Sequence, residues 1–263
     1  RVKYAARPWA GAMNCMSRDD RGEGNILPWC VAPRTGPIDR VKETIHSTKQ
    51  GRVTNHLIGG SLSEFVQSWA VHTPDKVALV DRTRCVTYSQ LAATANRIAN
   101  TLAAAFGNGV RVGYLGKNSA AFYEVWLGAN RAGCALVPFN WRSAPRELAA
   151  LLADADPAIL VVGSGFSQLA RDALRQSPVQ AYVLDENSLG EWLWDAHEGR
   201  PRFPPSADGI ALLTYTSGTT GVPKGVAITN GALVQWFRAA ESDPDTAWRS
   251  SDVGLMVMPN FHL

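Results

Sequence analysis

Hydroxyl, glycine and lysine residues are concentrated in one short stretch of the chain, residues 216–225. Its candidate ligand-binding residues are Thr216, Ser217, Gly218, Thr219, Thr220, Gly221 and Lys224. Glycine allows backbone N–H groups to come close to an anion, hydroxyls donate hydrogen bonds to phosphate oxygens, and lysine adds a mobile positive charge. This composition predicts a loop that holds a polyphosphate.

The flanks of this loop distinguish it from the P-loop of mononucleotide-binding proteins. That motif requires a glycine directly before its lysine, whereas Pro223 precedes Lys224 in this chain. Residues 210–215 and 226–229 both have the composition of short strands, so we expect the loop to connect a β-hairpin. A solvated turn rich in serine, threonine and glycine is the structural alternative.

The order of residues in the loop carries a family resemblance. Residues 215–225 read YTSGTTGVPKG, which resembles the signature loop of the AMP-forming adenylating enzymes. These include the acyl-CoA synthetases, the adenylation domains of nonribosomal peptide synthetases, and the luciferases. The resemblance implies that the loop holds the ATP phosphates, with Mg²⁺, while a carboxylate attacks the α-phosphate to give an acyl-adenylate and pyrophosphate. It implies phosphate contacts for the hydroxyls and Lys224, and close backbone approach at Gly218 and Gly221.

Three further motifs extend the resemblance over residues 57–263. Residues 86–91 (VTYSQL) and 127–142 (LGANRAGCALVPFNWR) are similar to family motifs for which we expect architectural roles. Within the second motif, we expect Gly133 to end a helix and place the strand that follows it. Residues 259–262 (PNFH) resemble a motif that lies near the acyl and adenine sites in the family.

His262 is the candidate catalytic residue that the last motif indicates. A lone histidine is often a structural turn residue, which is the alternative here. In acyl-CoA synthetases the matching residue lies beside the substrate carboxylate and changes rotamer between the two half-reactions. Peptide-synthetase adenylation domains instead have an aspartate that pairs with the substrate's α-amino group. The resemblance therefore implies a fatty, aryl or other simple carboxylic acid rather than an amino acid.

The chain departs from the family pattern after the loop. The family often has a Thr-His pair where this chain has Thr229 and Asn230. The resemblance therefore carries no role of that histidine over to this chain. Asparagine is a good helix N-cap, so we expect Asn230 to cap the helix that follows.

Composition indicates an ordinary globular protein. The chain has 263 residues, of which 46% are hydrophobic and 19% charged, and a formal net charge of +3. The excess positive charge lies in residues 1–56 without an aromatic stacking pattern, so we expect no nucleic-acid partner. Four widely spaced cysteines favour a reducing cytoplasm over a zinc site or a disulfide framework. No signal peptide or membrane span is apparent, although peripheral membrane contact stays open.

Residues 1–56 contain scattered proline and glycine without helical or strand periodicity, and we expect a disordered extension there. From residue 57 we expect an α/β fold of layered sheets with flanking helices, forming the N-terminal part of an adenylation domain. Ser61 and Glu64 predict a helix start, and apolar residues 91, 95, 98, 102 and 105 predict one helix face. The expected strands are 77–80, 85–87, 111–115, 135–137, 159–162, 181–184, 210–215, 226–229 and 256–258, and the expected helices after residue 107 are 120–131, 145–152, 167–176 and 230–240.

The resemblance implies an ATP-dependent acid–CoA ligase that forms an acyl-adenylate and then an acyl-CoA, with coenzyme A as cosubstrate. Two alternatives stay open: a non-catalytic nucleotide-binding protein, and an amino-acid adenylation domain. The family's ribose contact, acidic metal-binding motif and late catalytic lysine match nothing in residues 57–263. We therefore expect them beyond Leu263, and we expect residues 1–263 alone to be inactive.

Overall fold

The structure, a computed structural model, describes residues 60–201, 205–216, 224–242 and 247–262, and the backbone of 16–18 and 24–26. Within residues 1–56 it describes only an antiparallel pair of three-residue strands, which the sequence pattern did not predict. The disordered extension and the domain boundary at residue 57 stay predictions, because the rest of that segment lies outside the described residues.

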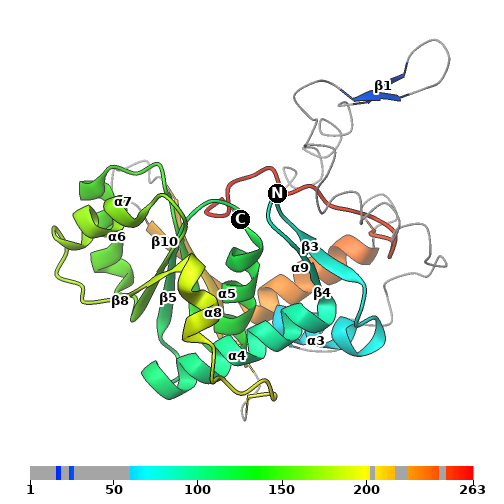
Figure 1. Ribbon diagram of the computed structural model, residues 1–263, viewed down its shortest axis with the longest axis horizontal. Coiled ribbons are helices and arrows are strands. Elements are labelled where there is room, and N and C mark those ends of the chain that lie inside the picture. Colours follow the sequence, from blue (N-terminus) through cyan, green and yellow to red (C-terminus); the bar gives the residue numbers. More distant parts are fainter. Residues whose placement is uncertain are drawn as a thin grey trace.

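The described elements alternate between strands and helices (Figure 1). In chain order they are β1 (Met16–Arg18), β2 (Gly24–Ile26), α3 (Leu62–His72), β3 (Val77–Val80), β4 (Cys85–Thr87), α4 (Tyr88–Phe106), β5 (Arg111–Leu115), α5 (Ala120–Arg131), β6 (Ala135–Phe139), α6 (Pro145–Ala155), β7 (Ile159–Val162), α7 (Ser167–Leu174), β8 (Tyr182–Asp185), the 3₁₀ turn η4 (Glu186–Ser188), α8 (Leu189–Trp192), β9 (Ile210–Thr216), β10 (Lys224–Thr229) and α9 (Asn230–Ser242).

A six-stranded sheet with the order β10-β9-β6-β5-β7-β8 forms the centre of the fold. Strands β5, β6, β7, β8 and β9 run parallel to their neighbours, and β10 is antiparallel to β9. Helices α6 and α7 cover one face of this sheet, and α4 and α5 cover the other (Figure 1). The predicted α/β class is confirmed, because helices cover both faces of a sheet whose strands are mostly parallel, which is how parallel sheets are normally buried.

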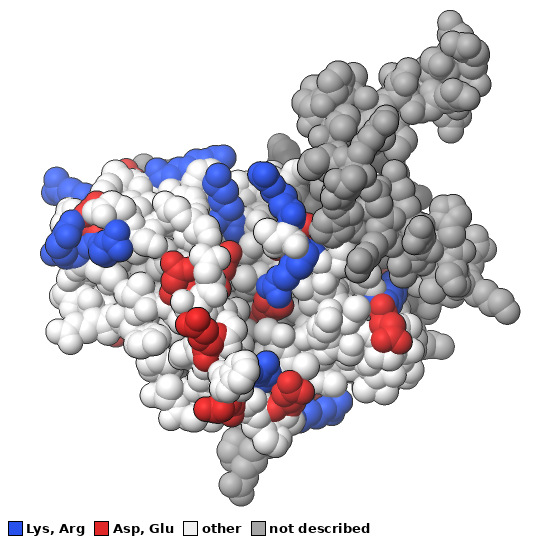
Figure 2. All heavy atoms as spheres, viewed as in Figure 1, with Lys and Arg blue, Asp and Glu red and all other residues white. Residues whose placement is uncertain are grey.

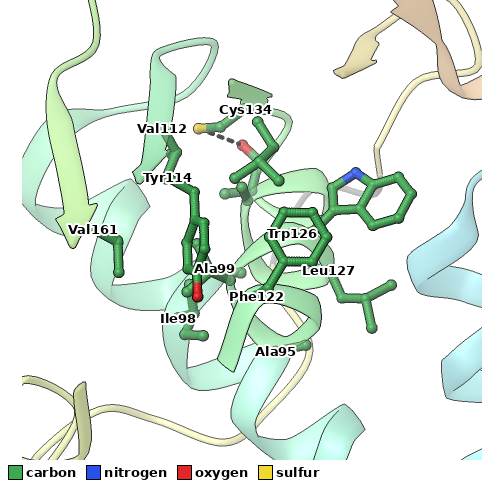
Figure 3. Close-up of a cluster of buried hydrophobic side chains, with 14 of the residues drawn as sticks. Ala95, Ile98, Ala99, Val112, Tyr114, Phe122, Trp126, Leu127, Cys134 and Val161 are labelled. Carbon is green, nitrogen blue, oxygen red and sulfur yellow. Dashed lines mark hydrogen bonds between the residues drawn. The ribbon is translucent and has the colours of Figure 1, made fainter. Parts of the chain in front are cut away.

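The core on the α4 and α5 face is built around aromatic residues. Tyr114 of β5 and Phe122 of α5 are both fully buried, and their rings meet edge to face with centroids 5.1 Å apart. Figure 3 shows Tyr114 and Phe122 side by side, with Ile98 and Ala99 of α4 and Trp126 of α5 in the same cluster. This packing fixes β5 and α5 relative to each other, and the turn between them carries residues of the candidate site.

Capping hydrogen bonds begin two of the helices, and the sequence predicted the first of them. Ser61 accepts a hydrogen bond from the Glu64 backbone N–H at 3.4 Å, which confirms the start of α3. Thr87 and Gln90 form a reciprocal capping box at the start of α4, so the VTYSQL motif is architectural, as expected. Gly133 has a φ of +70° directly after α5, which confirms its role in ending that helix.

Several element ends differ from the expected bounds. Strand β6 continues through Pro138 to Phe139, because its pairing with β9 involves only Leu136 and leaves the proline no ladder bond to donate there. Helix α6 runs on to Ala155 and stops where Asp156 adopts the left-handed conformation. Helix α7 ends at Leu174, and Ala105 of α4 is exposed rather than on the buried face.

The expected strand at 256–258 is wrong for the described residues. Met256, Val257 and Met258 are 46%, 65% and 53% exposed, and the segment has no strand assignment. An apolar run forms a strand only when a neighbouring strand takes its hydrogen bonds, and none of the described strands lies beside it.

Candidate active site

The phosphate-type loop connects β9 to β10, as the sequence predicted. Thr216 and Lys224 are partners at the loop end of this hairpin, followed by Tyr215 and Gly225 as the next pair away from the loop. Both Thr216 and Lys224 are exposed. The remaining candidate ligand residues, Ser217, Gly218, Thr219, Thr220 and Gly221, lie outside the described residues. The two described ends therefore locate the loop, and its internal contacts stay a prediction.

The loop leaves the sheet at the carboxyl edge of the parallel strands. Because β9 is parallel to β6, its last residue Thr216 lies at the same edge as Leu115, Phe139 and Val162, the last residues of β5, β6 and β7. Ligands of open α/β sheets bind outside this edge. The sheet therefore places the candidate loop where a nucleotide would be expected.

His262 lies at this edge too, beyond the ends of β5 and β6. Its backbone N–H donates to the carbonyl of Pro259 at 2.9 Å, which closes a turn, and its side chain is exposed. Phe261 is buried, with its ring centroid 4.6 Å from that of His262 and 6.3 Å from that of Trp141. Trp141 comes shortly after β6, so the turn packs on the loop that follows this strand.

Two cations flank the Trp141 ring. The Nζ of Lys117 lies 5.4 Å from the ring centroid, and the Cζ of Arg142 lies 4.6 Å from it. Figure 2 shows Lys and Arg side chains mainly on the upper half of the face drawn, and Asp and Glu side chains mainly below them. Lys117 and Arg142 thus form a positively charged rim beside Trp141, which attracts anions and suits a polyphosphate ligand.

The strand ends beneath this rim are tightly packed. A Cβ added to Gly116 would lie 3.2 Å from the Cα of Gly163, so β5 and β7 approach each other closely where they end. Below them, the Tyr114 hydroxyl donates to the Glu186 carboxylate and bonds Ser119 Oγ at 2.9 Å. Burial first, and then the charge of Glu186, raise the pKa of Tyr114. The phenol therefore stays protonated and serves as a fixed donor under the edge.

A second tyrosine ties the loop-bearing strand to its neighbouring helix. Tyr215 donates from its hydroxyl to Asp154 Oδ2 of α6 at 2.5 Å. Burial, followed by this hydrogen bond, raises the pKa of Tyr215. Helix α6 thus holds Tyr215, the residue that precedes the loop.

Asn230 does not cap α9, contrary to the expectation from sequence. The helix begins at Asn230, and the Ala232 N–H donates to Thr229 Oγ1 at 3.2 Å, so the neighbouring threonine makes the cap bond. The buried Asn230 side chain accepts from Asn130 of α5 and donates to the Ser206 carbonyl at 2.8 Å. The Asn230 amide therefore bonds residues that are distant in the chain, Asn130 and Ser206, and a local sequence pattern cannot reveal such partners.

Sequence reasoning missed four candidate site residues around the turn that carries His262, namely Lys117, Asn118, Trp141 and Arg142. Their common signal is position, because each directly follows a strand that ends at the carboxyl edge. Asn118 lies close enough to bond the segment before His262. Strand ends in a predicted parallel sheet could therefore have marked them as candidates.

Comparison with known proteins gives the family. The model of the AMP-binding enzymes matches residues 66–263 of this chain. Among sequence relatives, a fatty acid–[acyl-carrier-protein] ligase of Streptomyces coeruleorubidus is 33% identical over 74% of this chain and 38% of its own length. A long-chain-fatty-acid–CoA ligase of Mycobacterium tuberculosis is 34% identical over 68% of this chain and 36% of its own.

Solved structures agree with this match. The inhibitor-bound N-terminal domain of FACL13 from Mycobacterium tuberculosis has a TM-score of 0.63 and 29% identity, covering 76% of this chain and 52% of that one. A fatty acyl CoA synthetase of the same organism has a TM-score of 0.59 and 30% identity, covering 65% and 35%. The chain belongs to the family of AMP-binding enzymes, which confirms the resemblance inferred from the loop. It spans about two fifths of the length of the curated relatives it matches.

Proposed function

We propose that the intact protein is an AMP-forming acid–CoA ligase. A carboxylate oxygen attacks the α-phosphorus of ATP, pyrophosphate leaves, and the thiol of coenzyme A then displaces AMP to give the thioester. The observation that carries the proposal is the hydroxyl- and glycine-rich loop closed by Thr216 and Lys224 at the carboxyl edge, in a chain of the AMP-binding family. Relatives named as a fatty acid–[acyl-carrier-protein] ligase, an indoleacetate–CoA ligase and a long-chain-fatty-acid–CoA ligase support it.

The loop's task in this reaction is to position ATP and to neutralise the departing pyrophosphate. We assign the hydroxyls of Thr216, Ser217, Thr219 and Thr220 to phosphate oxygens, Gly218 and Gly221 to close backbone approach, and Lys224 to the outer phosphates. Phosphoryl and adenylyl transfer depend mainly on such positioning and charge stabilisation, because the protein supplies little covalent chemistry. The exposure of Thr216 and Lys224 is compatible with this task.

A Mg²⁺ ion would accompany the phosphates. This ion is usually held by phosphate oxygens and water, with one or two carboxylates from the protein. Across residues 60–201, 205–216, 224–242 and 247–262, no three His, Cys, Asp or Glu residues come together as a metal site. We therefore assign the ion to the ATP phosphates and its carboxylate ligand to the acidic motif that we expect beyond Leu263.

We assign His262 to the carboxylate of the acid substrate. Its imidazole is exposed, as a residue that meets a substrate must be, and the Phe261 beside it is buried and anchors the backbone at this point. No carboxylate stands at this position to pair with an α-ammonium group, so we propose fatty, aryl or related acids as substrates. The relatives named for fatty acids and indoleacetate support this class.

Pyrophosphate exchange on the intact protein tests the proposal. Fatty, aryl and amino acids are supplied separately with ATP and Mg²⁺, and thioester formation is then measured with coenzyme A. We expect exchange with fatty or aryl acids, loss of exchange in Lys224→Ala, and normal exchange in Arg82→Ala, which removes an exposed charge from the β3–β4 turn. Exchange with amino acids alone would identify an amino-acid adenylation domain instead.

Absence of exchange with every acid, combined with ATP binding, would identify a non-catalytic nucleotide-binding protein.

No helix among the described residues is long and apolar enough to cross a membrane. We place the reaction in the cytoplasm, because four widely spaced cysteines suit a reducing compartment.

A further inference from the structure

One asparagine side chain attaches the segment before His262 to the end of β5. The Nδ2 of Asn118 donates to the carbonyls of Met258 and Met256, at 2.7 Å and 3.2 Å. Its Oδ1 accepts from the backbone N–H of Asn260 at 2.8 Å. A single amide thus uses both donors and its acceptor on one short segment, which only Asn or Gln could do.

The Asn260 side chain makes a fourth hydrogen bond, from the segment back to the end of β5. Its Nδ2 donates to the carbonyl of Gly116 at 3.1 Å, and the residue is only 3% exposed. Gly116 directly follows β5, whose last residue Leu115 accepts a hydrogen bond from the Gly163 backbone N–H at 2.9 Å, so this carbonyl lies beside the paired ends of β5 and β7. The four hydrogen bonds, which we call the Asn118–Asn260 clasp, therefore connect the segment to a fixed point.

The clasp is important because little else holds the segment before the turn. Residues 253–258 have no strand partner among the described residues, and Leu255 and Val257 are each 65% exposed. After the clasp, the buried Phe261 packs against Trp141 and His262 follows directly. Among the described residues, the clasp, the contact between Phe261 and Trp141 and the hydrogen bond that closes the turn therefore set the position of the imidazole.

We propose that Asn118 is a positioning residue for His262, an inference that rests on the function proposed above. Its amide sets where the turn lies relative to the carboxyl edge, and hence where the imidazole meets the substrate carboxylate. A displacement of about 1 Å in a catalytic geometry can lower a rate about 100-fold. Asn118→Asp tests the amide specifically, because it replaces Nδ2 with an oxygen that faces two carbonyl oxygens.

A matched control exists on the distant helix α4. Asn100 Nδ2 also donates to two backbone carbonyls, those of His197 and Gly199, at 2.7 Å and 2.9 Å. Asn100→Asp makes the same chemical change away from the turn. In the intact protein, we expect Asn118→Asp to lower kcat at least tenfold with the KM for ATP within twofold, and Asn100→Asp to leave both unchanged.

A double-mutant cycle with His262→Ala separates positioning from general damage. If Asn118 acts through the imidazole, Asn118→Asp lowers kcat far less in the His262→Ala background than in the wild type. Equal losses in both backgrounds would overturn the proposal. Should Asn118→Asp fail to fold, Asn118→Ala removes the donors without adding a repelling oxygen, and the same comparison applies.

Hydrogen–deuterium exchange of residues 255–262 tests the clasp independently of activity. We expect faster exchange there in Asn118→Asp and not in Asn100→Asp. Unchanged exchange would overturn the clasp even if the wild type is an active ligase. A wild type without ligase activity, combined with faster exchange in the variant, would overturn the proposed function and the catalytic purpose of the clasp, while leaving its geometry established.

Discussion

Arg84 and Glu124 form a two-armed ion pair, with Nη1 to Oε1 at 2.9 Å and Nη2 to Oε2 at 2.6 Å. The Glu124 side chain is 2% exposed, whereas that of Arg84 is 45% exposed. The pair attaches the β3–β4 hairpin to α5, the helix that begins directly after Asn118 and Ser119. This ion pair therefore helps to hold α5, which follows directly after the residues of the clasp at the end of β5.

Removing Arg84 should destabilise the protein strongly. Burial raises the pKa of Glu124, and the hydrogen bond from Arg84 opposes that effect. Arg84→Met leaves the carboxylate buried without its partner, a change that typically costs about 3–5 kcal/mol. Urea unfolding of the intact protein measures the loss. Arg84→Met with Glu124→Leu should regain most of it, and a double variant no more stable than Arg84→Met would contradict this account.

Asp81 should make stability depend on pH between about 4 and about 2. Burial opposes ionisation, but hydrogen bonds from the Thr83 hydroxyl and from the backbone of Ala120, Thr83 and Arg84 together lower its pKa from 3.8 to about 2. A lowered carboxylate pKa stabilises the folded state above the unfolded pKa, and this contribution is lost as pH falls through the folded value.

Asp81→Asn should therefore lower the thermal midpoint most above pH 4, with the difference from wild type shrinking toward pH 2. Asp75→Asn, at an exposed position on the other side of β3, is the control. A difference that stays constant from pH 5 to pH 2 would rule out a titrating Asp81.

Gly128 should not tolerate a side chain. A Cβ built there would lie 2.5 Å from both Cβ and Cγ2 of Ile98, where α4 and α5 cross. Gly128→Ala should cost about 1–3 kcal/mol through overpacking. Ile98→Ala removes the clash with Cγ2 but keeps the one with Cβ, so the double variant should lose somewhat less stability than the two single variants combined. Gly190→Ala in α8 is the control, since no atom lies within 4 Å of its added Cβ.

Lys224→Ala combined with Thr219→Ala should impair the use of ATP while leaving the fold intact. Lys224 is exposed on β10, and Thr219 belongs to the polar loop. Lost charge-assisted phosphate contacts cost about 1.5–3 kcal/mol each, which corresponds to at least a tenfold loss of kcat/KM for ATP per contact. Steady-state kinetics and circular dichroism melting check the two halves of this prediction. Unchanged kinetics would remove the loop from the mechanism.

Sequence alone determined the parts of this protein that depend on local chemistry. The alternation of strand-like and helix-like segments predicted the parallel α/β sheet. The loop at residues 215–225 and its flanks predicted a hairpin, and its residue order predicted the family. The helix start at Ser61 and the helix end at Gly133 were also predicted. Each depends on bonds within a few residues or on side-chain periodicity, which the chain order carries directly.

Tertiary structure decided the contacts between residues far apart in the chain. Asn230 has the local chemistry of a helix cap, yet its amide bonds Asn130 and Ser206 because α5 and the 205–209 turn pack against it. Asn118 and Asn260 meet although 142 positions separate them, because a strand end and a later turn reach the same edge. Apolar residues 255–258 had the pattern of a buried strand, but burial requires a partner strand, which local pattern cannot supply.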